Sequence, residues 1–239
     1  MAPFARLIRF ESNGDIYFSD LGVDTIETPH LGSHITAYLS LDDLVAEKNS
    51  ATVSLGKLPV PANPPLWTKP AASLAAPHED IPMNKDRLIL DLTPVKGELV
   101  FVVSRECRDV SPAEAESYIL GYTAGNDLSC RLYQMPEQAG GQFFYAKAFD
   151  KFAPLGPALI SPEVFGDGKG LKLVTRVNGK VVQEVEILKD MIFAPAKILS
   201  FMSQGTTIPA GTAVMTGTPA GVGAFRSPDG FWIIEILSR

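Results

Sequence analysis

The sequence contains few of the residues that build disulfide frameworks and transition-metal centres. Its 239 residues include only two cysteines, Cys107 and Cys130, and three histidines. The spacing of the two cysteines matches no common zinc, redox or disulfide motif. Cysteine usage of this kind is typical of a reducing compartment, and we therefore predict a cytoplasmic protein.

Long apolar segments and basic clusters are also lacking. No stretch of 18 apolar residues occurs, and the N-terminus carries Arg6, Arg9 and Glu11 where a signal peptide needs an apolar run. The 21 basic and 27 acidic residues give a net charge of −6, and no basic run is interleaved with aromatics. These absences predict a protein that binds neither membranes nor nucleic acid.

The residues that are present favour one large domain with a small N-terminal element. Residues 1–60 combine a predicted β-hairpin around Asn13-Gly14, a short helix at 40–47 and the start of a proline-rich connector, LPVPANPPLW, which continues to residue 67. Residues 61–239 form the predicted catalytic domain. With 46% hydrophobic residues, the chain can bury a large core.

Strand signals dominate this second part. The run 98–103 is β-branched and aromatic, Ser111 begins a predicted helix, and strand signals continue through FFYAKAFD and LGPALISP. A hairpin is predicted around Asn178-Gly179, followed by a helix in MIFAPAKILSFMSQG and two strands, TAVMTGTP and FWIIEIL. The pattern predicts a mixed α/β, β-dominated fold with curled sheets.

Two carboxylates stand out in the most strongly patterned stretch. Glu98 opens the 98–103 strand, and Asp127 follows the predicted helix in GYTAGNDLSCR, where Gly121 and Gly125 interrupt the pattern. Such residues can meet in one cleft and act together. They can equally begin a strand and cap a turn with no functional role.

Six ordered sequence blocks resemble the fumarylacetoacetate hydrolase family. They are WTKPAASL, KGELVFVV, GYTAGNDLSCR, AKAFDKFAPLGPAL, VNGKVVQ with DMIF, and TGTPAGVG, within residues 64–223. The resemblance implies a β-sandwich-like roll of curled mixed sheets, a homodimer and a small-molecule substrate. Family members hydrolyse, decarboxylate, hydrate or isomerise 2-oxo acids and 1,3-dicarbonyl compounds, mostly with Mg²⁺ or a similar ion.

One departure from the family pattern concerns the metal. The family supplies three carboxylates, an E-x-E pair and the Asp of the N-D block, which correspond here to Lys96, Glu98 and Asp127. If Mg²⁺ or Mn²⁺ is retained, Glu98 and Asp127 are its ligands. We predict instead that Lys96 replaces the metal charge and that no cofactor binds. The alternative is that Lys96 points to solvent and water completes the metal site.

A second departure concerns water activation. Hydrolytic members carry a segment of the type G-L-N-Y-x-D-H-x-x-E, whose His and Glu form a general base. The corresponding stretch here, LGKLPVPANPPLWTKP, has neither residue. The three histidines lie elsewhere, at positions 30, 34 and 78, and we interpret His78 as a surface residue.

Other family positions persist. Lys147 matches a lysine that points at the substrate, where it stabilises an oxyanion or acts as a general acid. Lys69 fits the family pattern but also the entry to a strand, and Tyr122 and Asn126 fit structural roles. Further residues match substrate-binding positions, although Leu132 stands where the family is usually acidic: Arg131, Gln134, Thr216, Gly217 and Thr218.

Three hypotheses about function follow. In the first, Lys96 and Lys147 catalyse a non-hydrolytic, metal-independent decarboxylation, tautomerisation, isomerisation or cyclisation of an enolisable 2-oxo acid or 1,3-dicarbonyl compound. In the second, the chain is a catalytically silent binding protein or heterodimer partner. In the third, Glu98 and Asp127 hold a divalent metal that hydrolyses a C–C bond.

Overall fold

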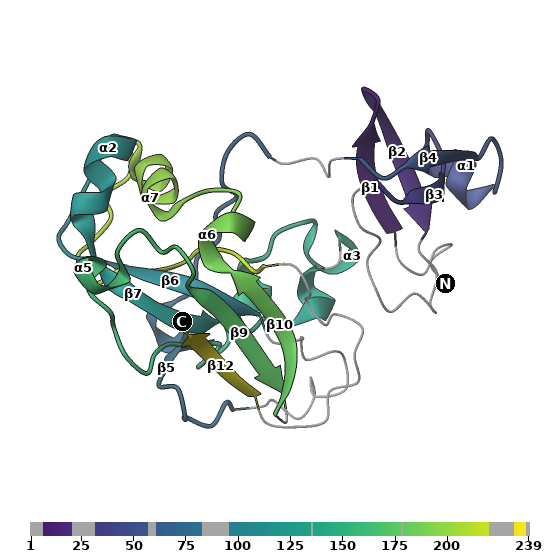
Figure 1. Cartoon of the computed structure of the whole chain (residues 1–239). Helices are drawn as coiled ribbons and strands as arrows, with labels where there is room; N and C mark the ends of the chain where they lie inside the picture. The colour runs from purple at the N-terminus through teal and green to yellow at the C-terminus, as the bar shows by residue number, and fades with distance from the viewer. Residues whose placement is uncertain are drawn as a thin grey trace. The chain divides into compact units, whose positions relative to one another are not determined.

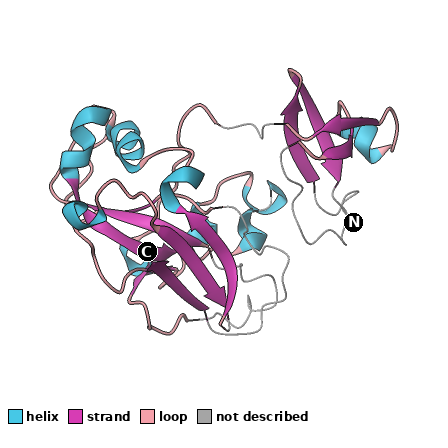
Figure 2. Ribbon diagram, viewed as in Figure 1, coloured by secondary structure: helices cyan, strands magenta, loops and turns pink. Residues whose placement is uncertain are grey.

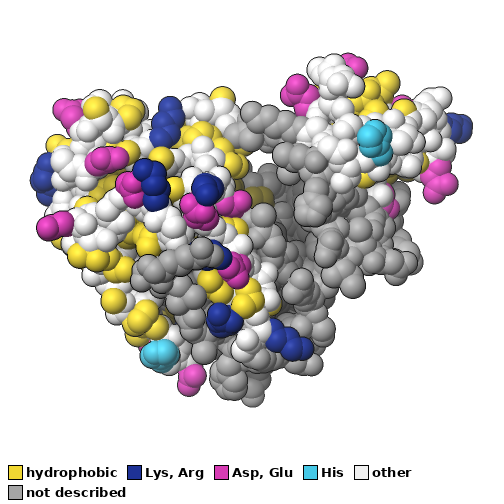
Figure 3. All heavy atoms as spheres, in the orientation of Figure 1, with side chains coloured by type: hydrophobic (Ala, Val, Ile, Leu, Met, Phe, Trp, Pro, Cys, Tyr) yellow, Lys and Arg dark blue, Asp and Glu magenta, His cyan; other side chains and the backbone are white. Residues whose placement is uncertain are grey.

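Two compact units make up the chain, Met1–Ala62 and Asn63–Arg239 (Figure 1). The computed structural model describes residues 7–20, 32–56, 61–82, 96–134, 136–177, 179–219 and 232–237. Within these ranges, no helix has both the length and the apolar character needed to cross a bilayer. On the face drawn in Figure 3, acidic and basic side chains are interspersed among apolar ones.

The N-terminal unit begins with the hairpin that the sequence predicts. Strand β1 (Leu7–Ser12) pairs antiparallel with β2 (Asp15–Asp20). The two residues between them, Asn13 and Gly14, have φ values of 52° and 90°. Consecutive positive φ values define the tight turn that matches the twist of a hairpin, which explains the Asn-Gly pair.

The rest of this unit packs on the hairpin. Strand β3 (His34–Ala37) pairs antiparallel with β4 (Ala51–Ser54), and α1 (Leu41–Val45) lies between them in sequence. The Ser40 hydroxyl caps α1 by accepting a hydrogen bond from the Asp43 N–H at 3.0 Å, which confirms the predicted helix. A small core unites the strands, formed by Phe10, Ala37 and Leu55.

Two three-stranded antiparallel sheets form the frame of the larger unit (Figure 2). One has the order β11 (Ala213–Met215), β6 (Gly97–Val103) and β7 (Ile119–Asn126). The other has the order β10 (Lys180–Glu186), β9 (Lys172–Val177) and β12 (Trp232–Leu237), which confirms the predicted hairpin and last strand. A short β5 (Leu74–Ala75) pairs in parallel with β8 (Ala153–Pro154).

Short helices surround the sheets, and among the described residues only one exceeds two turns. This is α7 (Pro195–Ser203), whose buried Ile198 and Leu199 confirm the predicted apolar face. The core contains residues of both sheets and of α7, among them Leu99, Phe101, Leu173 and Leu199. The remaining helices are α2 (Pro112–Ala115), α3 (Pro136–Ala139), α4 (Phe144–Lys147), α5 (Pro162–Phe165), α6 (Ile187–Asp190) and the 3₁₀ turns η1 (Ala71–Ser73), η3 (Glu116–Tyr118) and η4 (Arg131–Gln134).

The predicted helix before Asp127 is shorter than expected, and Asp127 follows a strand. Ser111 and Glu114 form the predicted capping box, but the helical segment gives way to β7 at Ile119. Gly121 and Gly125 lie inside β7, where close packing leaves no room for a side chain. A Cβ at Gly121 would lie 2.5 Å from the Ile160 carbonyl oxygen, and one at Gly125 would lie 2.6 Å from Val100.

Two other segments that were predicted to form strands, FFYAKAFD and LGPALISP, do not form them. FFYAKAFD contains α4, since a short apolar run is compatible with either element until packing decides. LGPALISP makes only single bridges to β7, at Leu155 and Ile160. Pro157 between them has no N–H to donate, which interrupts a regular ladder.

The register of the first sheet brings three chain segments together. Gly97 pairs with Asn126 and Glu98 with Gly125, so the start of β6 lies beside the end of β7. On the other edge of β6, Met215 of β11 pairs with Val100. The segments that contain Glu98, Asp127 and Thr216 therefore converge at one end of the sheet.

Candidate functional site

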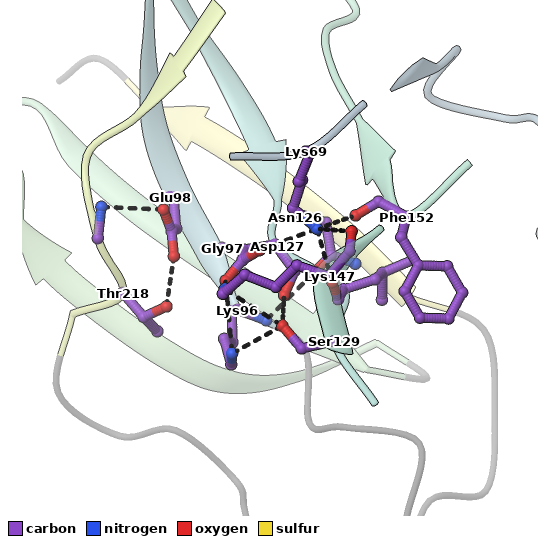
Figure 4. A network of polar contacts seen from close by, with 12 residues as sticks. Lys69, Lys96, Gly97, Glu98, Asn126, Asp127, Ser129, Lys147, Phe152 and Thr218 are labelled. Carbon is purple, nitrogen blue, oxygen red and sulfur yellow. Dashed lines mark hydrogen bonds and ion pairs between the residues drawn. The ribbon is translucent and has the colours of Figure 1, made fainter. Parts of the chain in front are cut away.

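Asp127 is the centre of a buried cluster of charges (Figure 4). Its carboxylate faces three ammonium groups. Lys69 Nζ lies 3.0 Å from Oδ1, Lys96 Nζ lies 3.4 Å from Oδ2, and Lys147 Nζ also contacts Oδ2. The side chains of Lys96, Lys147 and Asp127 are each less than a tenth exposed. Burial of this kind requires that the charges be paired.

Lys69 forms hydrogen bonds with several separate segments of the chain. It precedes η1, and its ammonium donates to the carbonyl oxygens of Leu128, Lys147 and Phe152 at 2.7, 3.2 and 2.8 Å. Because its three protons point at carbonyls, its contact with Asp127 Oδ1 is an ion pair without hydrogen-bond alignment. Lys69 is therefore part of the site, and more than the strand-entry feature that the sequence also allowed.

Lys96 and Lys147 share a second acceptor besides Asp127. The Ser129 hydroxyl oxygen lies 3.1 Å from Lys96 Nζ and 3.3 Å from Lys147 Nζ. Lys147 reaches this point from the last residue of α4, whereas Lys96 comes from the residue before β6. Lys96 is 6% exposed, so the alternative in which it points to solvent is wrong.

The pKa values of Asp127 and Lys69 are both lowered, but for different physical reasons. Burial by itself would raise the pKa of Asp127, but the ammonium groups of Lys69, Lys147 and Lys96 lower it to about 2. Burial lowers the pKa of Lys69 to about 8, although the charge of Asp127 acts against that fall. Asp127 is thus ionised at any pH near neutrality.

Glu98 lies in the same region but has neutral partners. The Gly217 N–H donates to Oε2 at 2.9 Å, and the Thr218 hydroxyl donates to Oε1 at 2.5 Å. Burial, and next the negative charge of Asp127, raise the pKa of Glu98. Thr216 donates to the Leu99 carbonyl oxygen at 2.9 Å. Two of the three residues of this turn that match substrate-binding positions, Gly217 and Thr218, therefore bind the carboxylate of Glu98.

Two amide side chains hold the converging segments in place. Gln183 of β10 accepts from the Gly97 N–H at 3.2 Å and donates to the Pro219 carbonyl oxygen at 3.3 Å. Asn126 accepts from the Lys96 N–H at 3.2 Å, a structural role as expected. Sequence reasoning missed Gln183, although it ends the block VNGKVVQ.

The remaining predicted residues are not joined to this cluster by any contact among the described side chains. Arg131 lies in η4, but its side chain is outside the described set. Gln134 is half-buried in the same turn, and its Oε1 has no partner among the described residues. Tyr122 stacks on Phe165 with ring centroids 4.0 Å apart. His78 is exposed as predicted, and His30 lies outside the described residues.

Comparison with known proteins settles the family. The protein-family model named fumarylacetoacetate (FAA) hydrolase C-terminal matches residues 33–233 of this sequence. The chain belongs to the fumarylacetoacetate hydrolase family. It is 36% identical to an uncharacterized protein of Archaeoglobus fulgidus over 95% of this chain and 90% of that protein. It is 34% identical to the mitochondrial oxaloacetate tautomerase FAHD2A of Homo sapiens over 73% of this chain, and spans about half (54%) of that relative.

Solved structures of the fumarylacetoacetate hydrolase family share the fold. Fumarylacetoacetate hydrolase from Exiguobacterium antarcticum matches with a TM-score of 0.63 and 25% identity, over 97% of this chain and 94% of that one. The 5-carboxymethyl-2-hydroxymuconate delta-isomerase from Mycobacterium smegmatis matches with a TM-score of 0.58 and 27% identity, over 92% and 91%. The predicted mixed, β-dominated fold is confirmed, with small sheets that do not close.

The divalent ion expected of this family does not fit the residues present. Of its three carboxylate positions, one is Lys96, and Asp127 is already paired with three ammonium groups. Two like unit charges 4 Å apart repel by about 4 kcal/mol at an effective dielectric constant near 20, and a dication doubles that figure. Among the described residues, no three His, Cys, Asp or Glu side chains are grouped to hold a metal.

Proposed function

We propose that this protein catalyses a non-hydrolytic reaction, most simply enol–keto tautomerisation, of a small anionic 2-oxo acid or 1,3-dicarbonyl compound. Isomerisation, decarboxylation and cyclisation of such substrates pass through the same enolate and use the same groups. The observation that carries the proposal is a buried carboxyl with a raised pKa, Glu98, at the same end of the sheet as a buried lysine cluster around Asp127.

The charge of the cluster suits an anionic substrate. Three ammonium groups and two carboxylates sum to +1, and to +2 when Glu98 holds a proton. An ammonium has three N–H donors, and the described contacts of Lys147 with Asp127 and Ser129 use two of them. The third can stabilise the oxygen on which negative charge develops as the enolate forms.

Glu98 supplies the proton transfer. As a carboxylate it removes a proton from the carbon next to the carbonyl, and the C–H electron pair becomes the C=C bond of the enolate. The enolate oxygen takes the charge beside Lys147, whose ammonium donates the proton that completes the enol. Glu98 then loses its proton to solvent and Lys147 takes one up, which restores both groups. A general base works best with a pKa near the working pH, and burial raises the pKa of Glu98 toward it.

No activated water is needed in this scheme. The stretch LGKLPVPANPPLWTKP lacks the His and Glu that hydrolytic relatives use, which argues against hydrolysis. The names of relatives support the same direction, since they include an oxaloacetate tautomerase and a delta-isomerase. Oxaloacetate is therefore the first substrate to test.

The test measures interconversion of enol and keto oxaloacetate by ultraviolet absorbance. We expect the wild-type protein to accelerate it, and Lys147→Met and Glu98→Gln each to lower kcat/KM by about 100-fold or more. Lys180→Met, at an exposed position on β10, is the matched control and should retain full activity. Equal rates in wild type and Lys147→Met would refute the assignment of Lys147. If no 2-oxo acid or dicarbonyl compound is turned over, the chain is the silent binding partner of the second hypothesis.

A further inference from the structure

We infer that the Lys96 ammonium occupies the place where the family binds a divalent ion, so that this protein takes Mg²⁺ or Mn²⁺ tightly only when Lys96 is replaced by an oxygen ligand. The inference concerns ion binding and does not depend on which reaction is catalysed. It rests on how Lys96 is held, on the state of the two carboxylates and on what one substitution would create.

The position of Lys96 is set by its own backbone. Its N–H donates to Asn126 Oδ1 at 3.2 Å, and its carbonyl oxygen accepts from the Asp127 N–H at 3.1 Å. The side chain therefore starts beside the carboxylate that it contacts. Its ammonium ends between Asp127 Oδ2 and Ser129 Oγ and is almost fully buried. A lysine anchored in this way differs from a long surface side chain that can swing into solvent.

Each oxygen of the two carboxylates already faces an ammonium group or accepts a hydrogen bond. Asp127 Oδ1 faces Lys69, and Oδ2 faces both Lys96 and Lys147. Both oxygens of Glu98 accept hydrogen bonds from the turn after β11. A metal ion would have to displace an ammonium group from Asp127. If it displaced Lys96, it would still lack the carboxylate ligand that the family supplies at that position.

One substitution would convert the site. Lys96→Glu places carboxylates at positions 96, 98 and 127, on a strand start and a neighbouring strand end whose register brings them together. Three carboxylates with water are a suitable ligand set for Mg²⁺ or Mn²⁺. The remaining ammonium groups of Lys69 and Lys147 would still contact Asp127.

The experiment titrates the full-length chain with Mn²⁺ and Mg²⁺ after chelator treatment, by calorimetry and by the shift in melting temperature. We expect Lys96→Glu to bind Mn²⁺ one to one with a Kd at least 100-fold lower than wild type, and to gain melting temperature with added metal. Lys180→Glu makes the same change in charge at an exposed position, and should behave as wild type. This control separates the creation of a ligand from a general gain of negative charge.

Two results would overturn the inference. One is tight one-to-one binding by the wild-type chain that Lys96→Glu does not improve. The other is a folded Lys96→Glu protein, judged by circular dichroism, that binds no tighter than wild type. If Lys96→Glu does not fold, Lys96→Gln decides, because its amide removes the charge and supplies a neutral oxygen ligand. Tighter Mn²⁺ binding by Lys96→Gln than by wild type supports the inference, and binding no tighter than wild type refutes it.

Discussion

Glu98 and Asp127 are two carboxylates at the same end of one sheet, yet their surroundings differ completely. Both are buried, so burial alone would raise both pKa values. Asp127 faces three ammonium groups, and its pKa falls to about 2. Glu98 accepts hydrogen bonds from a backbone N–H and a hydroxyl, and its pKa rises. The charge of the partners, rather than depth in the protein, decides the direction in which each pKa shifts.

The difference suggests a division of roles. Asp127 gathers the lysines and fixes their ammonium groups, whereas Glu98 remains able to exchange a proton. Each role depends on the other because the charge of Asp127 is the second cause that raises the pKa of Glu98. Isosteric substitutions that remove one charge at a time can separate the role of Asp127 from that of Glu98.

The largest effect is expected for Asp127→Asn. The substitution leaves three buried ammonium groups without a counter-charge, and uncompensated buried charges typically destabilise by about 3–5 kcal/mol. Urea denaturation should show the free energy of unfolding reduced by that amount. Asp150→Asn, at an exposed position after α4, is the control and should change it by less than about 0.5 kcal/mol. A loss below about 1 kcal/mol in Asp127→Asn would mean that the lysines do not need this partner.

A second expected effect is a rise in stability at alkaline pH that comes from Lys69. Its pKa is about 8 in the folded protein, against an ordinary value of 10.5. Between these values the unfolded chain binds more protons, so the unfolding free energy increases with pH and gains about 3 kcal/mol by pH 10.5. Urea denaturation at several pH values should show the gain in wild type relative to Lys69→Met. Parallel pH profiles for the two proteins would contradict it, and Lys180→Met should match wild type.

The smallest effect on stability is expected for Glu98→Gln. The glutamine oxygen can accept from the Gly217 N–H, and its amide can donate to the Thr218 hydroxyl oxygen, so no buried group loses its partner. The unfolding free energy should change by less than about 1 kcal/mol, in contrast to Asp127→Asn. Denaturation of both variants side by side tests the comparison directly. Equal losses would show that Glu98 is bound as an ion in the folded protein.

The sequence by itself determined the local elements and the family. The Asn13-Gly14 turn, the capped helix after Ser40, the hairpin of β9 and β10 and the last strand follow from short-range patterns. The ordered sequence blocks identified the fumarylacetoacetate hydrolase family, and they also drew attention to Lys96. Homodimer formation, cytoplasmic localisation and the roles of individual site residues stay predictions.

Only the tertiary structure decided how the site is assembled. The convergence of Lys69, Lys96 and Lys147 on Asp127 depends on strand register and on chain returns that no local pattern encodes. The same holds for the two glycines of β7, which resembled pattern breaks until the packing of Ile160 and Val100 explained them. Turn residues expected to face a substrate proved to hold Glu98, because a buried carboxylate takes the nearest donors wherever the fold places them.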